Sequence, residues 1–393
     1  MNTQPHDKVL SELLARSRLT PGRGLAELVA RTGLRMGLTG TAVYVADLQQ
    51  ETLQALPQSP APEEPALGVD TSLGGLAYRE ERTQRSADGD TLWVPMIDGV
   101  ERLGVMKATG HGFDPGLVDR CEALAAAAAL LLVSKSTHSD VLIEAERRRT
   151  MTVQAELLWA FLPPRTIGTA QVTSSACLEP AYDIGGDAFD HSLIDNGLHL
   201  TLLDSMGHDL ASGGASAAGL AACRATRRSG GSLADIVPEI DKILDQWFTD
   251  RLMTAVIATL DAEDGTLTWV NCGHPAPLLI RDGRVLHGML ERPADLPLGW
   301  GFHLTEPPTV HRVRLQPGDR VLIYSDGVTE ARSPAGDLFG EERLADIVIR
   351  STAAGAAAPE ALRRLVRTLR KHQDLPLRDD ATILLTEWHP DQG

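Results

Sequence analysis

The second half of the chain is a series of strand-like segments separated by short turns. Beyond Pro164, six such runs follow one another: GTAQVTSSACLE, HLTLLDSM, LMTAVIATLDAEDGTLTWVNCG, APLLIRDGRVL, HRVRLQPGDRVLIYSDG and ATILLTEW. Several of them contain or meet at short turns such as AEDG, RDGR and QPGD, which are typical of neighbouring antiparallel strands. Helical segments interrupt the strands at 212–228, 234–248, 340–350 and 358–371. The sequence therefore predicts an α+β fold of stacked layers around a largely antiparallel sheet.

Residues 1–135 have a different, mixed pattern. An early segment, GLAELVARTGLRMG, has apolar residues at helical spacing: Leu25, Leu28, Val29 and Leu34. The later segment TLWVPMIDGVERLGVMKA contains two apolar runs joined at Asp98-Gly99, a favoured tight turn, and predicts a hairpin. Since 393 residues favour two or three domains of ordinary size, we expect a separate N-terminal α/β domain here.

Residues 117–162 predict a long, nearly continuous helix between the two halves, which the Pro163-Pro164 pair ends. The middle of this segment, EAERRRT, is charged, and its end has three apolar residues on one face: Val153, Leu157 and Phe161. A helix of this kind between domains often pairs with a second copy of itself, which predicts a homodimer. The alternative is a helix that lies on its own domain. The expected division is into three parts: domain 1–135, linker helix 136–164 and domain 165–393.

The composition disfavours several classes of function. A formal charge of −16 and a pI near 5.2 disfavour nucleic acid as a partner and an anionic membrane surface as a location. The longest apolar run, 123–133, is too short to cross a bilayer, and the N-terminus lacks the apolar core of a signal peptide. The four cysteines form no CxxC pattern, which indicates a reducing compartment without a disulfide framework. We therefore expect a cytoplasmic protein.

Acidic residues recur where strands of the second half begin or end. They are Asp187 in DIGGDAFD, Asp204 after HLTLL, Asp326 after RVLIY, and the pair Asp379-Asp380 before ATILL. A single Asp beside Gly is ordinarily a turn residue. If these strand ends converge, however, the carboxylates share one rim, and divalent cations must offset their repulsion. Carboxylate oxygens suit Mg²⁺ or Mn²⁺, and two such ions can activate a water for attack on phosphorus, with the Ser205 carbonyl as a further ligand.

The block GGDAF also differs by one letter from the GGDEF signature of diguanylate cyclases. That active site needs a second acidic residue directly after GGD, and Ala188 stands there instead. The sequence therefore argues against a cyclase. Of the acids in this stretch, Asp187 is the predicted metal ligand. Asp183 and Asp190 are expected to shape the turn or to contact the metal ligands without binding the metal themselves.

Six blocks carry a family resemblance, in order along residues 145–390: ELLWAFLPPR, YDIGGDAFD, LLDSMGHDLAS, MTAVIATLD with VNCGHPAPLLI, LIYSDGVTEAR and DDATILL. They resemble the metal-dependent serine/threonine protein phosphatases of the PPM (2C) type, and within them the SpoIIE/RsbU-like bacterial branch. Each block alone is modest, but six in the right order are specific. The resemblance implies an α-β-β-α sandwich at 165–393. It also implies hydrolysis of phosphoserine or phosphothreonine by a water bridging two Mn²⁺ or Mg²⁺ ions.

The site residues of this family can be carried over to matching positions. Asp187 and Asp204 would hold the two ions, with the Ser205 carbonyl assisting. The shell of one ion would be completed by Asp326 and Asp379, and Asp380 is the second choice because the family's ligand lies three residues before Thr382. The implied substrate is a phosphorylated STAS-type anti-sigma factor antagonist. The alternatives are a pseudophosphatase that serves as a phosphoprotein-binding scaffold, and a hydrolase of small phosphate esters.

Two positions depart from the family pattern, since Leu203 and Asp209 stand where glycine is usual. Leu203 is compatible with a strand, whereas Asp209 would be an extra metal ligand, a perturbing charge or a solvent-facing residue. We expect structural roles for His208 and His274, with a turn-stabilising role for His274. The segment SGGASAAGLAACRATRR after the Asp204 block is either a switch element or a closely packed helix.

Residues 18–135 resemble a GAF domain, chiefly through the hairpin VPMIDGVERLGVMKA. The resemblance implies a sensor that binds a small ligand, whose identity the sequence does not indicate, or a dimerisation domain. His111 and Cys121 are expected to be structural rather than haem-binding or redox residues. The combined prediction is a sensor phosphatase in which the linker helix couples the first domain to the second.

Overall fold

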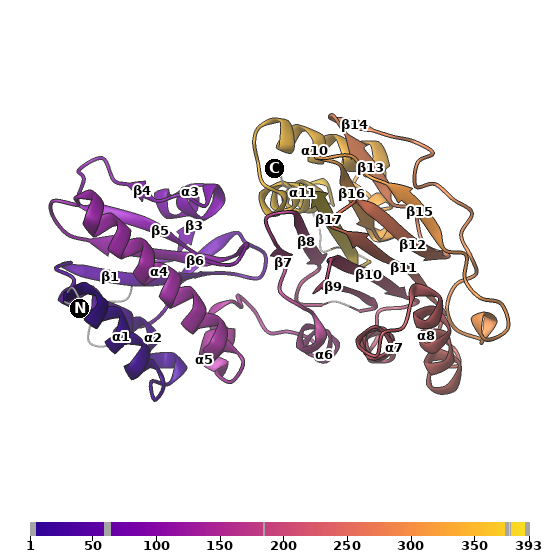
Figure 1. Ribbon diagram of the computed structural model, residues 1–393, viewed down its shortest axis with the longest axis horizontal. Helices are drawn as coiled ribbons and strands as arrows, with labels where there is room; N and C mark the ends of the chain where they lie inside the picture. Colours follow the sequence, from indigo (N-terminus) through magenta and orange to yellow (C-terminus); the bar gives the residue numbers. More distant parts are fainter. Residues whose placement is uncertain (1–4, 59–63, 184, 374–376, 378, 390–393) are drawn as a thin grey trace. The chain divides into compact units, whose positions relative to one another are not determined.

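The computed structural model describes residues 5–58, 64–183, 185–373, 377 and 379–389. Within it the chain divides into two units, 1–150 and 151–393 (Figure 1). The boundary falls inside the segment 136–164 that we expected to be a linker. Ile184 in the GGD block and Arg378 before the DDATILL block lie outside the described residues.

The first unit contains one antiparallel sheet with the strand order β3-β2-β1-β6-β5-β4. Its strands are β1 (Gly40–Ala46), β2 (Thr52–Ala55), β3 (Leu67–Gly68), β4 (Gln84–Arg85), β5 (Thr91–Asp98) and β6 (Glu101–Thr109). The predicted hairpin is confirmed, since β5 pairs with β6 and Gly99 takes the positive φ of 59° that a tight turn requires.

Helices cover both faces of this sheet. They are α1 (Pro5–Ser17), α2 (Leu25–Arg35), α3 (Leu73–Glu80), α4 (Pro115–Ser136) and α5 (Asp140–Ala145). Successive residues of β1 point to opposite faces, so Val43 packs against α1, α2 and α4 while Tyr44 packs towards α3. Leu34 of α2 is 58% exposed, although we expected it on the buried face. Among the described residues, no helix is both long enough and apolar enough to cross a bilayer.

The predicted continuous helix over 117–162 is wrong. Three helices occupy this segment: α4, α5 and α6 (Val153–Phe161). Thr152 caps α6 by accepting a hydrogen bond from the backbone N–H of Ala155, and such hydroxyl caps favour a helix start over a helix interior. Arg148, in the charged middle, forms an ion pair with Glu51 of the first unit (2.9 Å). Glu144 lies in α5, whereas the charged residues 146–149 belong to a non-helical connection.

The second unit contains two sheets whose named strands all pair in antiparallel fashion, as predicted. The five-stranded sheet has the order β15-β12-β11-β10-β9, and the six-stranded sheet has the order β14-β13-β16-β17-β8-β7. The strand bounds are β7 (Thr166–Gly168), β8 (Val172–Glu179), β9 (Asp187–Ile194), β10 (Gly197–Ser205), β11 (Met253–Asp261), β12 (Thr266–Cys272), β13 (Leu278–Arg281), β14 (Arg284–Val285), β15 (His311–Arg314), β16 (Arg320–Tyr324) and β17 (Ala381–Trp388).

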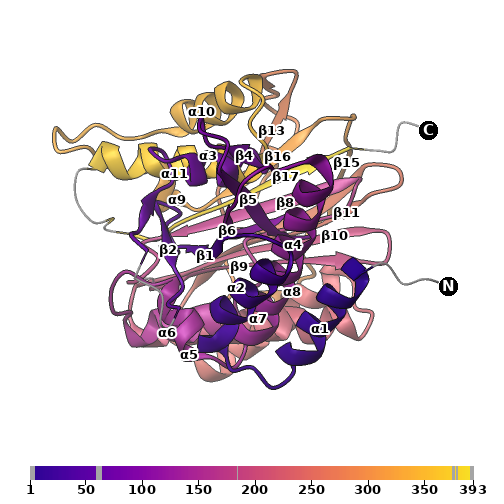
Figure 2. The same ribbon diagram turned by 90° about the vertical axis from the view of Figure 1, so that its left-hand side faces the viewer.

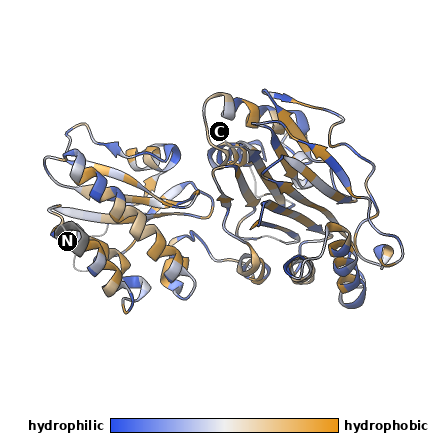
Figure 3. Cartoon of the chain, viewed as in Figure 1, coloured by the Kyte–Doolittle hydropathy of each residue, from blue (hydrophilic) through white to orange (hydrophobic). Residues whose placement is uncertain are grey.

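The helices of this unit lie outside the two sheets. They are α6, α7 (Leu210–Arg228), α8 (Leu233–Trp247), α9 (Asp326–Thr329), α10 (Glu341–Ala353) and α11 (Ala358–Gln373). The four predicted helical segments are confirmed as α7, α8, α10 and α11. Figures 1 and 2 show α7 and α8 beside the β9–β12 sheet and α10 and α11 beside the other. Figure 3 shows hydrophobic residues along the strands, where the apolar cores lie.

Candidate active site

Two of the predicted ligands lie side by side at one end of the five-stranded sheet. Asp187 is the first residue of β9, and Asp204 is the next-to-last residue of β10. The antiparallel register places these two residues directly opposite each other. Ser205 then ends β10. The strand pairing alone thus brings one carboxylate of the GGD block next to the carboxylate of the following block.

The other predicted ligands gather at one end of the two central strands of the six-stranded sheet. Tyr324, the last residue of β16, pairs with Ile383 of β17. Just beyond this pair, Ser325 N donates to Thr382 O (3.0 Å), and Thr382 N donates to Ser325 Oγ (2.9 Å). Asp326 comes shortly after the end of β16, and Asp379-Asp380 come directly before β17. These hydrogen bonds hold the three acids at the same end of the paired strands β16 and β17.

Asp380 joins the two sheets. Its Oδ2 accepts hydrogen bonds from the backbone N–H groups of Gly185 (2.9 Å), Gly186 (2.6 Å) and Asp187 (3.0 Å). The side chain is only 6% exposed. A carboxylate directly before β17 therefore holds the loop that leads into β9. Asp379, by contrast, is exposed and accepts a hydrogen bond from the N–H of Asp380 (3.0 Å).

The glycines around the site permit backbone contacts that a side chain would block. A Cβ at Gly186 would lie 2.3 Å from the carbonyl oxygen of Ser205, and one at Gly327 would lie 2.1 Å from that of Asp380. Such distances do not occur for real Cβ atoms, so both positions need glycine. The loop before β9 thus packs directly on the turn after β10, and α9 packs directly on the start of β17.

The carboxylates are close enough to change each other's pKa values. Burial, followed by the charges of Asp204 and Asp380, raises the pKa of Asp187 well above its usual range. Burial, followed by the charges of Asp326, Asp379 and Asp380, raises the pKa of Asp204 to about 7. The pKa of Asp326 is also raised, first by burial and then by Asp379. Acids from both sheets thus form one electrostatic cluster.

The donor set of this cluster fits a hard divalent cation. Three buried oxygens of this cluster lack a hydrogen bond of ordinary length: Asp187 Oδ2, Ser205 Oγ and Thr382 Oγ1. Buried polar atoms are normally satisfied, and carboxylate oxygens are what Mg²⁺ and Mn²⁺ prefer. Among the described residues, however, no three acidic, His or Cys side chains already stand in a metal-binding arrangement. The acids share one rim, but they do not form a ready coordination shell.

Asp209 has a structural partner outside this cluster. It precedes α7, where its Oδ1 accepts a hydrogen bond from the N–H of Ser212 (2.9 Å), and its Oδ2 pairs with Arg251 (2.7 Å). The side chain is 54% exposed. The backbone and hydroxyl hydrogen bonds from Ser212 and the hydrogen bond from Arg251 lower the pKa of Asp209 to about 2. Of the three interpretations that the sequence left open for Asp209, its exposure favours a solvent-facing residue, and the structure adds that it caps α7 and pairs with Arg251.

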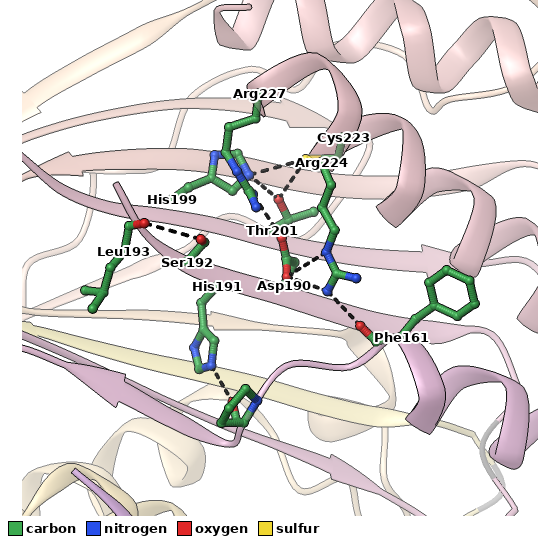
Figure 4. Close-up of polar contacts among 11 residues, drawn as sticks. Phe161, Asp190, His191, Ser192, Leu193, His199, Thr201, Cys223, Arg224 and Arg227 are labelled. Atoms are coloured by element: carbon green, nitrogen blue, oxygen red, sulfur yellow. Dashed lines mark hydrogen bonds and ion pairs between the residues drawn. The ribbon is translucent and has the colours of Figure 1, made fainter. Parts of the chain in front are cut away.

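Asp190 lies away from the rim, against α7. It is 2% exposed and receives hydrogen bonds from Arg224 (2.7 Å) and Arg227 (2.9 Å), as Figure 4 shows. Arg224 also donates to the carbonyl of Phe161, the last residue of α6 (2.7 Å). Sequence reasoning missed this buried ion cluster, whose signal was two arginines one helical turn apart on a helix next to an acidic strand. Asp183 is exposed, at the turn before the GGD block.

Of the two histidines in the matched blocks, one is built into a turn. His274 is 5% exposed; its Nδ1 lies 2.6 Å from Thr254 Oγ1 and its Nε2 lies 3.0 Å from the Tyr324 carbonyl. Asn271 brackets the turn, since its side chain accepts from His274 N and donates to His274 O. His208 is exposed, and its backbone packs against Gly185. The expected structural role of His274 agrees with these contacts.

Part of the second unit matches a known family. Residues 194–389 match the family model described as Stage II sporulation protein E (SpoIIE). This match identifies a SpoIIE-type phosphatase domain in the second unit. The matched range includes Asp204, Asp326, Asp379 and Asp380, whereas Asp187 lies seven residues before it, so the place of Asp187 in the site rests on the strand register.

Relatives and solved structures are similar only over parts of the chain. Protein IcfG of Synechocystis sp. is 27% identical over 132 residues, which are 33% of this chain and 20% of that protein. The PTC7 homolog fig of Drosophila sechellia, a protein phosphatase, is 34% identical over 90 residues, 19% of this chain and 28% of that protein. The chain thus spans less than a third of the length of these curated relatives. The SiaA-PP2C domain of Pseudomonas aeruginosa has a TM-score of 0.49 at 23% identity, covering 60% of this chain and 94% of that one. The RsbU and RsbW domains of Rv1364c from Mycobacterium tuberculosis have a TM-score of 0.48 at 22% identity, covering 58% and 63%.

Proposed function

We propose that this protein hydrolyses phosphoserine or phosphothreonine in a protein substrate, with two Mn²⁺ or Mg²⁺ ions held by the acidic rim. The observation that carries the proposal is the convergence of Asp187 and Asp204 from one sheet with Asp326 and Asp379 from the other. Because these acids raise each other's pKa values, they need a positive counter-charge to ionise together. The match to a phosphatase family supplies the class of reaction.

Each part of the site has a distinct task in this proposal. Asp187 and Asp204 would hold both ions with the Ser205 carbonyl, and Asp326 and Asp379 would complete the shell of one ion. When bound, the ions would supply an activated water and neutralise charge on the phosphoryl group. Asp380 keeps the GGD loop in place through three backbone N–H groups, so it positions Asp187 and is not assigned to the metal shell.

We propose a STAS-type anti-sigma factor antagonist, phosphorylated on Ser or Thr, as the substrate. The support is the resemblance of the six sequence blocks to the SpoIIE/RsbU-like branch. For the first unit we propose a GAF-like sensor that responds to a small ligand, acts through dimerisation in the cytoplasm, and regulates the phosphatase unit. Its β5–β6 hairpin and its six-stranded sheet with helices on both faces support this assignment.

The proposed activity can be tested with the purified full chain. Mn²⁺-dependent release of p-nitrophenol from p-nitrophenyl phosphate tests phosphatase chemistry, and release of phosphate from a phosphoserine STAS protein tests the substrate class. Asp326→Asn should lower kcat by about 100-fold or more, because replacing even a residue that only orients a metal ligand lowers activity 10- to 100-fold. Full activity of this variant would remove Asp326 from the site. Turnover of the small ester alone would favour the esterase alternative, and no turnover of either would favour the phosphoprotein-binding scaffold.

A further inference from the structure

Arg251 lies beside the turn that carries the predicted metal ligands of β10. It belongs to the connection between α8 and β11, and its side chain is 17% exposed. Its Nη1 donates to the carbonyl of Met206 (3.1 Å) and to Ser212 Oγ (3.3 Å), and its Nη2 donates to Asp209 Oδ2 (2.7 Å). One guanidinium thus contacts Met206 at the beginning of the turn 206–209, Asp209 at the end of this turn, and Ser212 in the first helical turn of α7.

The middle residue of the turn, Gly207, leaves no room for a side chain. Gly207 has φ of 95°, and a Cβ there would lie 2.7 Å from Nη1 of Arg251. The guanidinium therefore lies directly against the backbone of the turn. The neighbouring backbone is fixed as well, because Met206 N donates to the carbonyl of Leu252 (2.9 Å), next to Arg251.

The other side of the same turn packs on the loop that holds Asp187. A Cβ at Gly186 would meet the carbonyl oxygens of both Ser205 (2.3 Å) and Gly207 (2.6 Å), and one at Gly185 would meet the backbone of His208 (2.2 Å). Any shift of the turn therefore shifts either the Ser205 carbonyl or the GGD loop. Arg251 packs on the side of the turn that faces away from the GGD loop.

Asp209 connects Arg251 to the start of α7. Its carboxylate orients Arg251 through Oδ2 and caps α7 through Oδ1. The hydrogen bonds from Ser212 and Arg251 go to an ionised carboxylate, which makes them stronger than hydrogen bonds between neutral groups.

We propose that Arg251 is a positioning residue for metal binding, and that Asp209 holds its guanidinium against the turn after Asp204. The inference rests on the proposed function in that Asp204 and the Ser205 carbonyl are taken as metal ligands. Arg251 contacts neither ion nor substrate in this proposal. It fixes the backbone from Ser205 to Ser212, so that the Ser205 carbonyl and Asp204 are already in place when an ion arrives.

The test compares three variants of the full chain, Arg251→Ala, Arg251→Lys and Asp209→Gly, with a matched control. The control is Arg320→Ala, because Arg320 is equally buried (19% exposed) and pairs with Glu387 in the other sheet. Mn²⁺ affinity is measured by isothermal titration calorimetry without substrate, and amide hydrogen exchange is measured over residues 205–212. Steady-state kinetics with p-nitrophenyl phosphate give kcat and KM at several Mn²⁺ concentrations.

Arg251→Ala should weaken Mn²⁺ binding about tenfold, as expected for a residue behind the metal ligands. Exchange over 205–212 should become faster, and saturating Mn²⁺ should restore kcat with KM for the ester unchanged. Arg251→Lys should keep part of the affinity, Asp209→Gly should resemble Arg251→Ala, and Arg320→Ala should match the wild type.

Wild-type Mn²⁺ affinity and exchange in Arg251→Ala would overturn the proposal, and so would an equal loss of affinity in Arg320→Ala. If the wild type binds Mn²⁺ without hydrolysing any ester, the proposed function fails, and the affinity and exchange data still decide the role of Arg251. If the wild type binds no Mn²⁺, a positioning role for Arg251 in metal binding is overturned as well.

Discussion

The neighbouring acids Asp379 and Asp380 should separate catalysis from stability. Asp380 accepts hydrogen bonds from three buried backbone N–H groups, and Asp379 is exposed at the rim. Replacing Asp380 by Ala leaves those three donors unpaired, and each buried unpaired group costs roughly 1–3 kcal/mol. Loss of one negative charge from the acidic cluster offsets part of this cost. We therefore expect Asp380→Ala to lower the free energy of unfolding by about 3 kcal/mol, near the lower end of that sum.

Two further variants make this estimate specific. Asp380→Asn keeps one oxygen that can accept the same three hydrogen bonds, so it should cost only about 1 kcal/mol. Asp379→Ala should change the free energy of unfolding by less than about 0.5 kcal/mol, as is usual for an exposed side chain. Asp379→Ala should nevertheless lose Mn²⁺-dependent turnover, because the proposal places this carboxylate on an ion.

The assay is urea unfolding in buffer with a chelator, so that metal binding does not contribute to the measured stability. The urea midpoint is compared at constant m-value, and turnover of p-nitrophenyl phosphate is measured separately with Mn²⁺. The reasoning is refuted if Asp380→Ala unfolds at the wild-type midpoint. It is equally refuted if Asp379→Ala loses as much stability as Asp380→Ala.

Three other predictions concern the phosphatase unit. Arg224→Ala removes hydrogen bonds to Asp190 and Phe161 and should cost about 3 kcal/mol in urea unfolding, whereas Arg227→Ala removes one and should cost about 1.5 kcal/mol; equal costs would count against this ranking. Burial lowers the pKa of His274 to about 4, below the unfolded value near 6.5, so the unfolded chain takes up the proton first as pH falls. The stabilisation that comes from this pKa difference is fully present above pH 6.5 and is lost towards pH 4, by up to about 3 kcal/mol. His274→Asn should flatten that part of the pH–stability curve. Addition of Mn²⁺ at 100 times its Kd should stabilise the metal-free protein by about 2.7 kcal/mol in the same urea assay, and an unchanged midpoint would argue against the site.

The strands and the positions of the acids beside them were predictable because they depend on local patterns. Alternating apolar runs and short turns indicated antiparallel strands, and the acids next to those runs marked strand ends. Once Asp204 is known to lie near the end of one strand and Asp187 to begin its neighbour, the pairing puts them opposite each other. The family resemblance supplied the chemistry that this geometry alone does not determine.

The features that the sequence did not reveal depend on contacts between distant residues. The predicted long helix ignored the cap at Thr152 and the ion pair of Arg148 with Glu51, which are separated by 97 residues. The role of Asp380 depends on amides of the GGD loop some 194 residues away. Arg251 meets Asp209 only because β10 and β11 are paired, so neither residue alone indicated the contact.

The central claim is that acids from two sheets hold a pair of divalent cations. Anomalous diffraction at the manganese edge from Mn²⁺-soaked crystals of the full chain tests it most directly. We predict two manganese peaks about 4 Å apart, in contact with Asp187, Asp204, Asp326 and Asp379 and with the Ser205 carbonyl, and none on Asp209. Crystals that contain no manganese among these carboxylates at saturating Mn²⁺, or that contain it only elsewhere, would contradict the account.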